Sequence, residues 1–236
     1  MDPVVQQLVE KLQKAYGDRL VSVVLYGSAA AGDRQKGFSD YNVLCVLRRV
    51  TPQELSDGEA VFRWWRERGS PSPLLLGEQE LAASTDCFVI EFHDMKRQHQ
   101  LLAGKDVISN LAVDGRYYRS QVEHDLRAKV LRLRQKASGM LSDSGLLLRL
   151  LLDSVSTFCV LFRHALILHG ADGPATKRET IARASQQFAF DPQPFEKLLA
   201  VREGKLKARD VDPAALLGSY LEAISVVIAA VDGLET

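Results

Sequence analysis

Apolar residues repeat with two different periods along this chain, and the change falls near its middle. The first half alternates short β-branched runs with helical patterns. From residue 116 onward the apolar positions keep helical spacing, without a convincing strand. The pattern therefore predicts an α+β protein in two domains, residues 1–110 and 111–236, of which the second is an all-α helical bundle. Strands are predicted at 20–26, 40–48, 73–77 and 87–93.

Capping signals set the helix boundaries. Asp2 followed by Pro3 is an N-cap with proline at the first helical position, and Gly17 ends the helix that they begin. Thr51 with Glu54 forms a capping box that opens a second helix. A short helix is expected at 78–83, and the helices of the second half are expected at 116–138, 144–169, 176–188, 193–203 and 213–232.

The balance of charged residues argues against a protein that binds nucleic acid mainly through its net positive charge. Lys plus Arg and Asp plus Glu both number 30, so the net positive field that a polyanion partner requires is absent, and any polyanion site must be local. Cys45, Cys87 and Cys159 stand far apart in apolar runs, which predicts buried thiols rather than a disulfide or zinc framework. We therefore expect a cytoplasmic protein, since no basic segment followed by an apolar stretch opens the sequence.

The leucine-rich segment 146–168 is long enough to raise the question of a membrane. Arg149, Asp153 and Arg163 interrupt it, and each charge at a bilayer centre costs about 2.5 to 3.5 kcal/mol. We therefore expect a buried helix of the bundle and no membrane partner. Arg149 and Asp153 stand four residues apart and can pair on one helix face.

The segment YGSAAAGDRQKGFSDYNVLCV, residues 26–46, holds the candidate site. Gly27 and Ser28 follow directly after a predicted strand, where backbone N–H groups and a serine hydroxyl can approach a phosphate. Asp40 starts the next strand, and residue 42 points to the same face because side chains alternate. Two carboxylates so placed can share a metal, but residue 42 is Asn42, which offers a neutral carbonyl oxygen.

The order of features in this segment resembles the nucleotidyltransferase fold of the polymerase beta superfamily. These features are a strand, a Gly-Ser pair, a loop, and Ser39-Asp40-x-Asn42 at the start of a further strand. The run SDYNVLCVL looks most like the kanamycin nucleotidyltransferase branch, which also carries a helical second domain. The resemblance implies a mixed sheet with flanking helices and an active site in the cleft between the domains. It also allows a homodimer.

The resemblance further implies the roles of the site residues. In such enzymes two acids of this strand and a third from a neighbouring strand hold two Mg²⁺ ions, which orient a nucleoside triphosphate. Glu91, inside CFVIEFH, matches the third position. The expected metal ligands are thus Asp40, Asn42 and Glu91, with Asp40 and Glu91 as the catalytic carboxylates. Gly27 and Ser28 are expected to bind the nucleotide.

Two functions follow from this set of residues. The first is transfer of a nucleoside monophosphate from a Mg-NTP to a hydroxyl acceptor. The second is nucleotide binding or a scaffold role with weak or absent catalysis, because Asn42 leaves two negative charges in the cluster instead of three. An asparagine can still bind Mg²⁺, as in the catalytic loop of protein kinases.

Two further patterns leave alternatives open. Arg163 and His169 are separated by five residues, which is loosely similar to the Arg-x(4–6)-His signature of HEPN ribonucleases, yet both also suit the negative end of a helix dipole. The basic segment 116–136 could reach a triphosphate or RNA, or form a solvated helix face.

Overall fold

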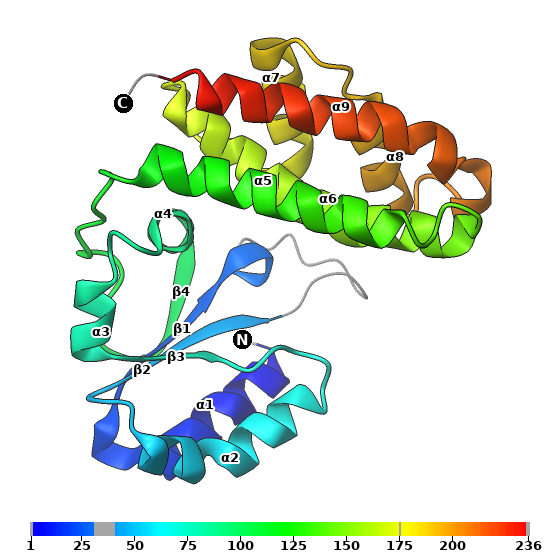
Figure 1. Cartoon of the computed structure of the whole chain (residues 1–236). Coiled ribbons are helices and arrows are strands. Elements are labelled where there is room, and N and C mark those ends of the chain that lie inside the picture. The colour runs from blue at the N-terminus through cyan, green and yellow to red at the C-terminus, as the bar shows by residue number, and fades with distance from the viewer. Residues whose placement is uncertain (1, 31–40, 175, 235–236) are drawn as a thin grey trace. The chain divides into compact units, whose positions relative to one another are not determined.

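The computed structural model describes residues 2–30, 41–174 and 176–234. The chain divides into two compact units, residues 1–117 and 118–236 (Figure 1). The sequence placed this division between residues 110 and 111. Each unit has its own buried core and is described by itself.

A four-stranded mixed sheet forms the centre of the first unit. Its strands are β1 (Leu20–Tyr26), β2 (Asn42–Leu47), β3 (Leu74–Gly77) and β4 (His99–Gly104), in the order β3-β2-β1-β4. β1 runs antiparallel to β2 and to β4, whereas β2 and β3 are parallel. The mixed sheet that the resemblance implied is confirmed.

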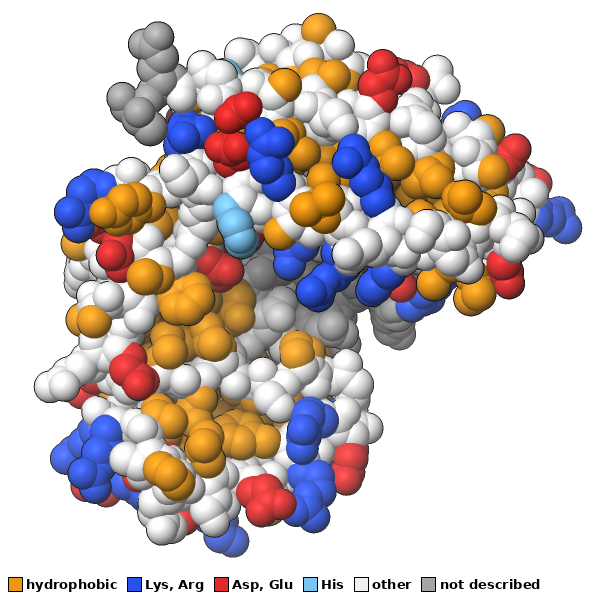
Figure 2. Space-filling view, viewed as in Figure 1, with side chains coloured by type: hydrophobic (Ala, Val, Ile, Leu, Met, Phe, Trp, Pro, Cys, Tyr) orange, Lys and Arg blue, Asp and Glu red, His pale blue; other side chains and the backbone are white. Residues whose placement is uncertain are grey.

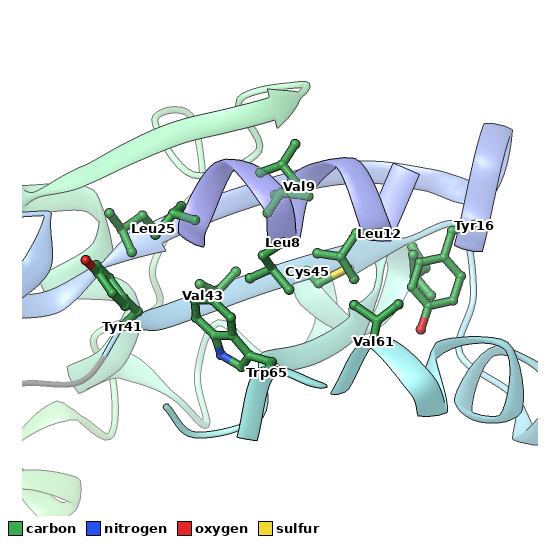
Figure 3. Close-up of a cluster of buried hydrophobic side chains, with 13 residues drawn as sticks. Leu8, Val9, Leu12, Tyr16, Leu25, Tyr41, Val43, Cys45, Val61 and Trp65 are labelled. Atoms are coloured by element: carbon green, nitrogen blue, oxygen red, sulfur yellow. The ribbon is translucent and has the colours of Figure 1, made fainter. Parts of the chain in front are cut away.

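Helices cover both faces of this sheet. Helices α1 (Pro3–Tyr16) and α2 (Pro52–Arg66) pack on one face, where Leu8 and Trp65 meet Val43 and Cys45 of β2 (Figure 3). Helices α3 (Glu78–Ala83) and α4 (Val89–Arg97) contribute to the cluster on the other face. The alternation along β1 and β2 thus sends apolar side chains to two cores, which fixes the register of the strands.

The expected strand at 87–93 is wrong, because this segment enters helix α4. Val89, Phe92 and Met95 lie three residues apart and are all buried, as one side of a helix packed on a sheet requires. The fourth strand is β4 instead, which the sequence analysis did not predict. Glu91 therefore lies in the first turn of a helix and not on a strand.

The capping box of α2 is confirmed and joins a network of polar contacts. Thr51 and Glu54 cap each other's backbone N–H groups. Arg19 donates to Glu54 Oε1 at 2.9 Å and to Asp57 Oδ2 at 2.7 Å. The Tyr16 hydroxyl donates to the carbonyl of Glu54 at 3.0 Å. These contacts tie the end of α1 to the start of α2.

In the part of the second unit that the structure describes, the five predicted helices are all present as α-helices. They are α5 (Tyr118–Ala137), α6 (Ser144–Leu168), α7 (Lys177–Phe188), α8 (Gln193–Arg202) and α9 (Pro213–Asp232). Helix α6 packs against the other four. By length and composition alone, α6 and α9 could each cross a membrane, but α6 is a largely buried helix of the bundle, as expected.

Two smaller expectations have different outcomes. Arg149 Nε lies 3.1 Å from Asp153 Oδ2, which confirms the pair on α6. All three cysteines are free thiols, and Cys45 and Cys159 are buried. Cys87 is exposed, contrary to expectation, because it lies in the turn before α4 and not in a buried strand.

Candidate functional site

The turn after β1 is the first element of the candidate site. Tyr26 ends the strand, and a single 3₁₀ turn, η2 (Gly27–Ala29), follows. Gly27 has φ +74°, a conformation that favours glycine. A Cβ at Gly27 would lie 3.0 Å from Nδ2 of Asn42. The side chain of Asn42 therefore lies directly against the turn that is expected to bind phosphate.

Strand pairing brings three polar side chains to one end of the sheet. Tyr26 is opposite Asn42 on β2 and opposite His99 on β4. Directly opposed residues of antiparallel strands share a face, so the three side chains leave the sheet on the same side. Tyr26 packs against the cluster that contains Phe92 and Met95. This side of the sheet is therefore the one that α4 covers.

Glu91 approaches this end of the sheet from α4. Its side chain is exposed. Burial raises the pKa of Tyr26, and the negative charge of Glu91 raises it further. The carboxylate thus lies close enough to act on the residue that pairs with Asn42, although a helix and not a strand presents it.

The other expected site residues have separate outcomes. Asp40 lies outside the described residues, so its distance from Glu91 stays a prediction. The backbone of Ser28 forms part of η2, and its side chain lies outside the described part of the chain. Of the five residues, the structure brings together Gly27, Asn42 and, through its charge on Tyr26, Glu91.

His99 is a further polar residue at this end of the sheet, to which the sequence analysis gave no role. It begins β4, and this neighbouring strand, HQLLAG, holds no acid. Its Nδ1–H donates to the carbonyl of Met95 at 2.8 Å, and its Nε2 lies 3.3 Å from Asp106 Oδ1. The ring is therefore held on both sides. The short run HQLLAG could have predicted the strand, but nothing in it predicts the contacts of the His99 ring.

Asp106 is itself fixed by hydrogen bonds. The hydroxyl of Ser109 donates to its carboxylate, and the backbone N–H groups of Ile108 and Ser109 each donate to it at 3.0 Å. These bonds, with a smaller contribution from His99, lower the pKa of Asp106 to about 2. A charged carboxylate therefore lies beside His99 across the neutral pH range.

The donor atoms at this end of the sheet fit a magnesium ion by type. Asn42 supplies an amide oxygen and Glu91 a carboxylate, and Mg²⁺ prefers oxygen ligands. Within the described ranges, no group of three or more His, Cys, Asp or Glu side chains is placed to hold a metal. The third oxygen donor of the expected set is Asp40.

The pair expected for a ribonuclease takes part in packing within the bundle, with Arg163 buried and His169 half-buried. Arg163 is only 9% exposed within α6. His169 donates from Nδ1 to the carbonyl of Ala165 at 2.9 Å, and its ring centroid lies 4.9 Å from that of Phe188. These contacts are those of a helix end packed in a bundle. The ribonuclease alternative stays a prediction.

Comparison with known proteins identifies the fold. No family model matches the chain, and no curated protein matches it. Among solved structures, the chain is similar to the crystal structure of spectinomycin adenyltransferase AAD(9) from Enterococcus faecialis with ATP and spectinomycin. The TM-score is 0.62 at 13% identity, over 97% of this chain and 99% of that chain. The protein therefore has the polymerase beta-like nucleotidyltransferase fold, an α+β sheet unit followed in sequence by a helical unit.

Proposed function

We propose that the protein binds a nucleoside triphosphate at the Gly27–Ser28 turn and transfers its nucleoside monophosphate to a hydroxyl acceptor. The observation that carries this proposal is the contact between Asn42 and the Gly27 turn, with Glu91 acting on the adjacent Tyr26. The turn proposed to bind phosphate and the side chains that offer oxygen donors thus lie at the same end of the sheet. The fold neighbour was solved with ATP and spectinomycin, which supports a nucleotide and a hydroxyl compound as the two ligands.

The proposed reaction is a displacement at the α-phosphorus. The acceptor oxygen forms a bond to this phosphorus, and the bond from the phosphorus to the oxygen bridging to the β-phosphate breaks. Pyrophosphate leaves with that electron pair. The hydroxyl proton passes to a carboxylate within hydrogen-bond reach, and Glu91, whose charge acts on Tyr26 at this end of the sheet, is the proposed acceptor.

The chain's own groups would position the nucleotide for this reaction. The backbone N–H groups of the Gly27–Ala29 turn can donate to phosphate oxygens, because the glycine lets a phosphate approach the backbone closely. Asp40, Asn42 and Glu91 would hold Mg²⁺. When bound, this ion supplies charge stabilisation to the phosphates and aligns the attacking and leaving oxygens.

A second function, nucleotide binding with little or no transfer, is favoured by one residue. Asn42 lies where the resemblance places an acid, and it is neutral. Asp40 and Glu91 then supply two negative charges, enough to offset one divalent ion, whereas a second ion meets too little negative charge. Under this alternative the protein binds Mg-NTP but transfers little or no nucleoside monophosphate.

Calorimetry with the four common NTPs and Mg²⁺ tests whether the turn binds nucleotide. We expect weak binding, and we expect Ser28→Ala to weaken it further, because a hydrogen bond to a charged group contributes about 1.5 to 3 kcal/mol. Ser138→Ala, an exposed serine on the helical unit, is the matched control. Equal affinities for the two variants would show that the nucleotide does not use this turn.

Release of pyrophosphate separates the two functions. The protein is incubated with Mg-NTP and a panel of hydroxyl compounds, and free pyrophosphate is measured. Release that is lost in Asp40→Asn supports transfer. Nucleotide binding without release, under conditions in which binding is saturated, supports the second function.

A further inference from the structure

A small hollow lies between α5 and α6 in the helical unit. Its volume is about 160 Å³. Helix α5 lines it with Lys129, Arg132 and Lys136, and α6 lines it with Asp153 and Thr157 among others. Leu133, Leu150 and Phe158 belong to its apolar lining.

The three α5 cations form one row, here called the α5 cation row (Lys129, Arg132 and Lys136). Positions three and four apart lie side by side on a helix surface, so the row follows one side of α5. All three side chains are exposed. Figure 2 shows Lys and Arg side chains along α5. No acid occurs in the sequence from 126 to 142, so the surrounding stretch of α5 offers no counter-charge.

The charge of the row is not balanced by the facing helix. Arg149 already binds Asp153 at 3.1 Å, and Asp153 is the one acid among the described lining residues. For the part of the chain that the structure describes, no ion pair is recorded for any of the three cations. Other α5 arginines differ, because Arg119 and Arg127 both bind Glu123. The hollow thus concentrates positive charge in a chain of zero net charge.

The size and shape of the hollow restrict the ligand. Pockets that enclose a whole small molecule measure about 300 to 1,000 Å³, so only part of a ligand can enter this one. Phe158 is 1% exposed and offers no free ring on which a base could stack. The row extends over eight residues, and its seven steps of about 1.5 Å each give a length of about 10 Å. A linear series of anionic groups suits such a row better than one isolated anion.

We propose that the α5–α6 hollow and the α5 cation row bind a chain of phosphate groups. Lys and Arg would neutralise successive phosphates, and the Thr157 hydroxyl can donate a further hydrogen bond. The phosphates belong either to a triphosphate or to the backbone of a single-stranded nucleic acid. This inference does not depend on the proposed function, because it uses no residue of the first unit.

Two probes and two triple variants test the proposal on the full-length protein. The probes are inorganic tripolyphosphate, followed by calorimetry, and a short fluorescent oligouridylate, followed by anisotropy at several salt concentrations. The first variant removes the row, with Lys129→Gln, Arg132→Gln and Lys136→Gln. The matched control removes three cations elsewhere in the helical unit, with Lys197→Gln, Lys207→Gln and Arg209→Gln. Arg132→Glu serves as a single change if the triple variant unfolds.

We expect at least one probe to bind, and the row variant to bind it about tenfold more weakly than the control, since each exposed charge contributes modestly. For the oligouridylate, the slope of log affinity against log salt should fall by about 2, at about 0.7 for each phosphate that the protein no longer neutralises. Preference for tripolyphosphate or for the oligouridylate identifies the source of the phosphates. The row variant and the control are also compared on a Ser28→Ala background, which weakens the phosphate contact of the Gly27–Ser28 turn, so that binding lost with the row is assigned to the hollow.

Two results would overturn the proposal. In the first, neither probe binds the unmodified protein at low salt. In the second, the row variant and the control weaken binding equally, which would show an effect of total charge and no local site. Binding of anionic lipid vesicles without binding of either probe would also contradict it, because a lipid surface carries its phosphates in a plane and not in a chain.

Discussion

Asn42 decides how much negative charge the candidate site carries. Its side chain lies against the Gly27 turn. Burial raises the pKa of Tyr26, the residue opposite it on β1, and the negative charge of Glu91 raises this pKa further. An acid at position 42 would add a third carboxylate to the expected set. The difference between a binding protein and an efficient transferase can therefore depend on one side chain.

We predict that Asn42→Asp tightens binding of Mn²⁺ or Mg²⁺ in the presence of NTP by about tenfold or more. Even with water-like screening, a carboxylate about 4 Å from a divalent ion gains about 2 kcal/mol. Calorimetric titration of the metal measures the change, with Asn110→Asp, an exposed position in the same unit, as the control. Unchanged metal affinity would mean that residue 42 does not face the metal, and that SDYN does not correspond to the family motif.

His99 shows what sequence reasoning could not find at the residue scale. The resemblance pointed to Glu91, whose charge acts on Tyr26 but which a helix and not a strand carries, and its role as a metal ligand stays a prediction. The strand beside β1 begins with a histidine, however, whose ring is held by Met95 and Asp106. These contacts depend on β4 following α4 almost at once and on the course of the chain after Gly104, which no spacing rule predicts.

At the scale of elements, the segments that were predicted well carry strong end signals. Proline and capping residues begin α1 and α2, and β1 and β2 are apolar runs buried on both sides. β4 was missed because it is an edge strand without a fully buried residue. The run from 87 to 93 was assigned to a strand because its residues are β-branched and aromatic, although the buried residues follow a helical repeat.

The capping box of α2 should make stability depend on acid pH. The hydrogen bond from Thr51 and the contact with Arg19 lower the pKa of Glu54 to about 2, against an ordinary value of 4.5. A lowered pKa in the folded state stabilises the protein above the ordinary value, and this contribution is lost as the pH falls toward 2.

We therefore expect Glu54→Gln to lower the urea midpoint of unfolding at neutral pH, and the difference from the unmodified protein to shrink as the pH falls from 4.5 toward 2. Glu59→Gln is the control, since Glu59 pairs with Arg63 on the exposed side of the same helix. A difference that stays constant across this range would show that the charge of Glu54 does not stabilise α2.

At the scale of the whole molecule, each unit has a core of its own. The sheet unit buries Trp65, Leu8 and Leu12 between α1, α2 and the strands, whereas the helical unit is built around α6. The sequence predicted this organisation because the period of its apolar residues changes near the middle. The acceptor could not be predicted, since acceptor specificity depends on side chains from several elements without a fixed spacing.

Because each unit has its own core, a cavity made in one unit should destabilise that unit and not the other. Leu151→Ala on α6, at a fully buried position, should cost about 2 to 5 kcal/mol. Hydrogen exchange followed by mass spectrometry should show faster exchange in α5 to α9, with β1 and β2 unchanged. Leu12→Ala in the sheet unit is the reciprocal control. Equal loss of protection in both units after either change would show that they unfold together.

The space that Gly27 leaves beside Asn42 also bears on how this sequence can evolve. Aspartate has nearly the same shape as asparagine, so the pocket against the turn accepts either side chain without repacking. Their codons differ by a single base. A carboxylate at position 42 is thus one mutational step away, and that step leaves the strand and the turn around it in place.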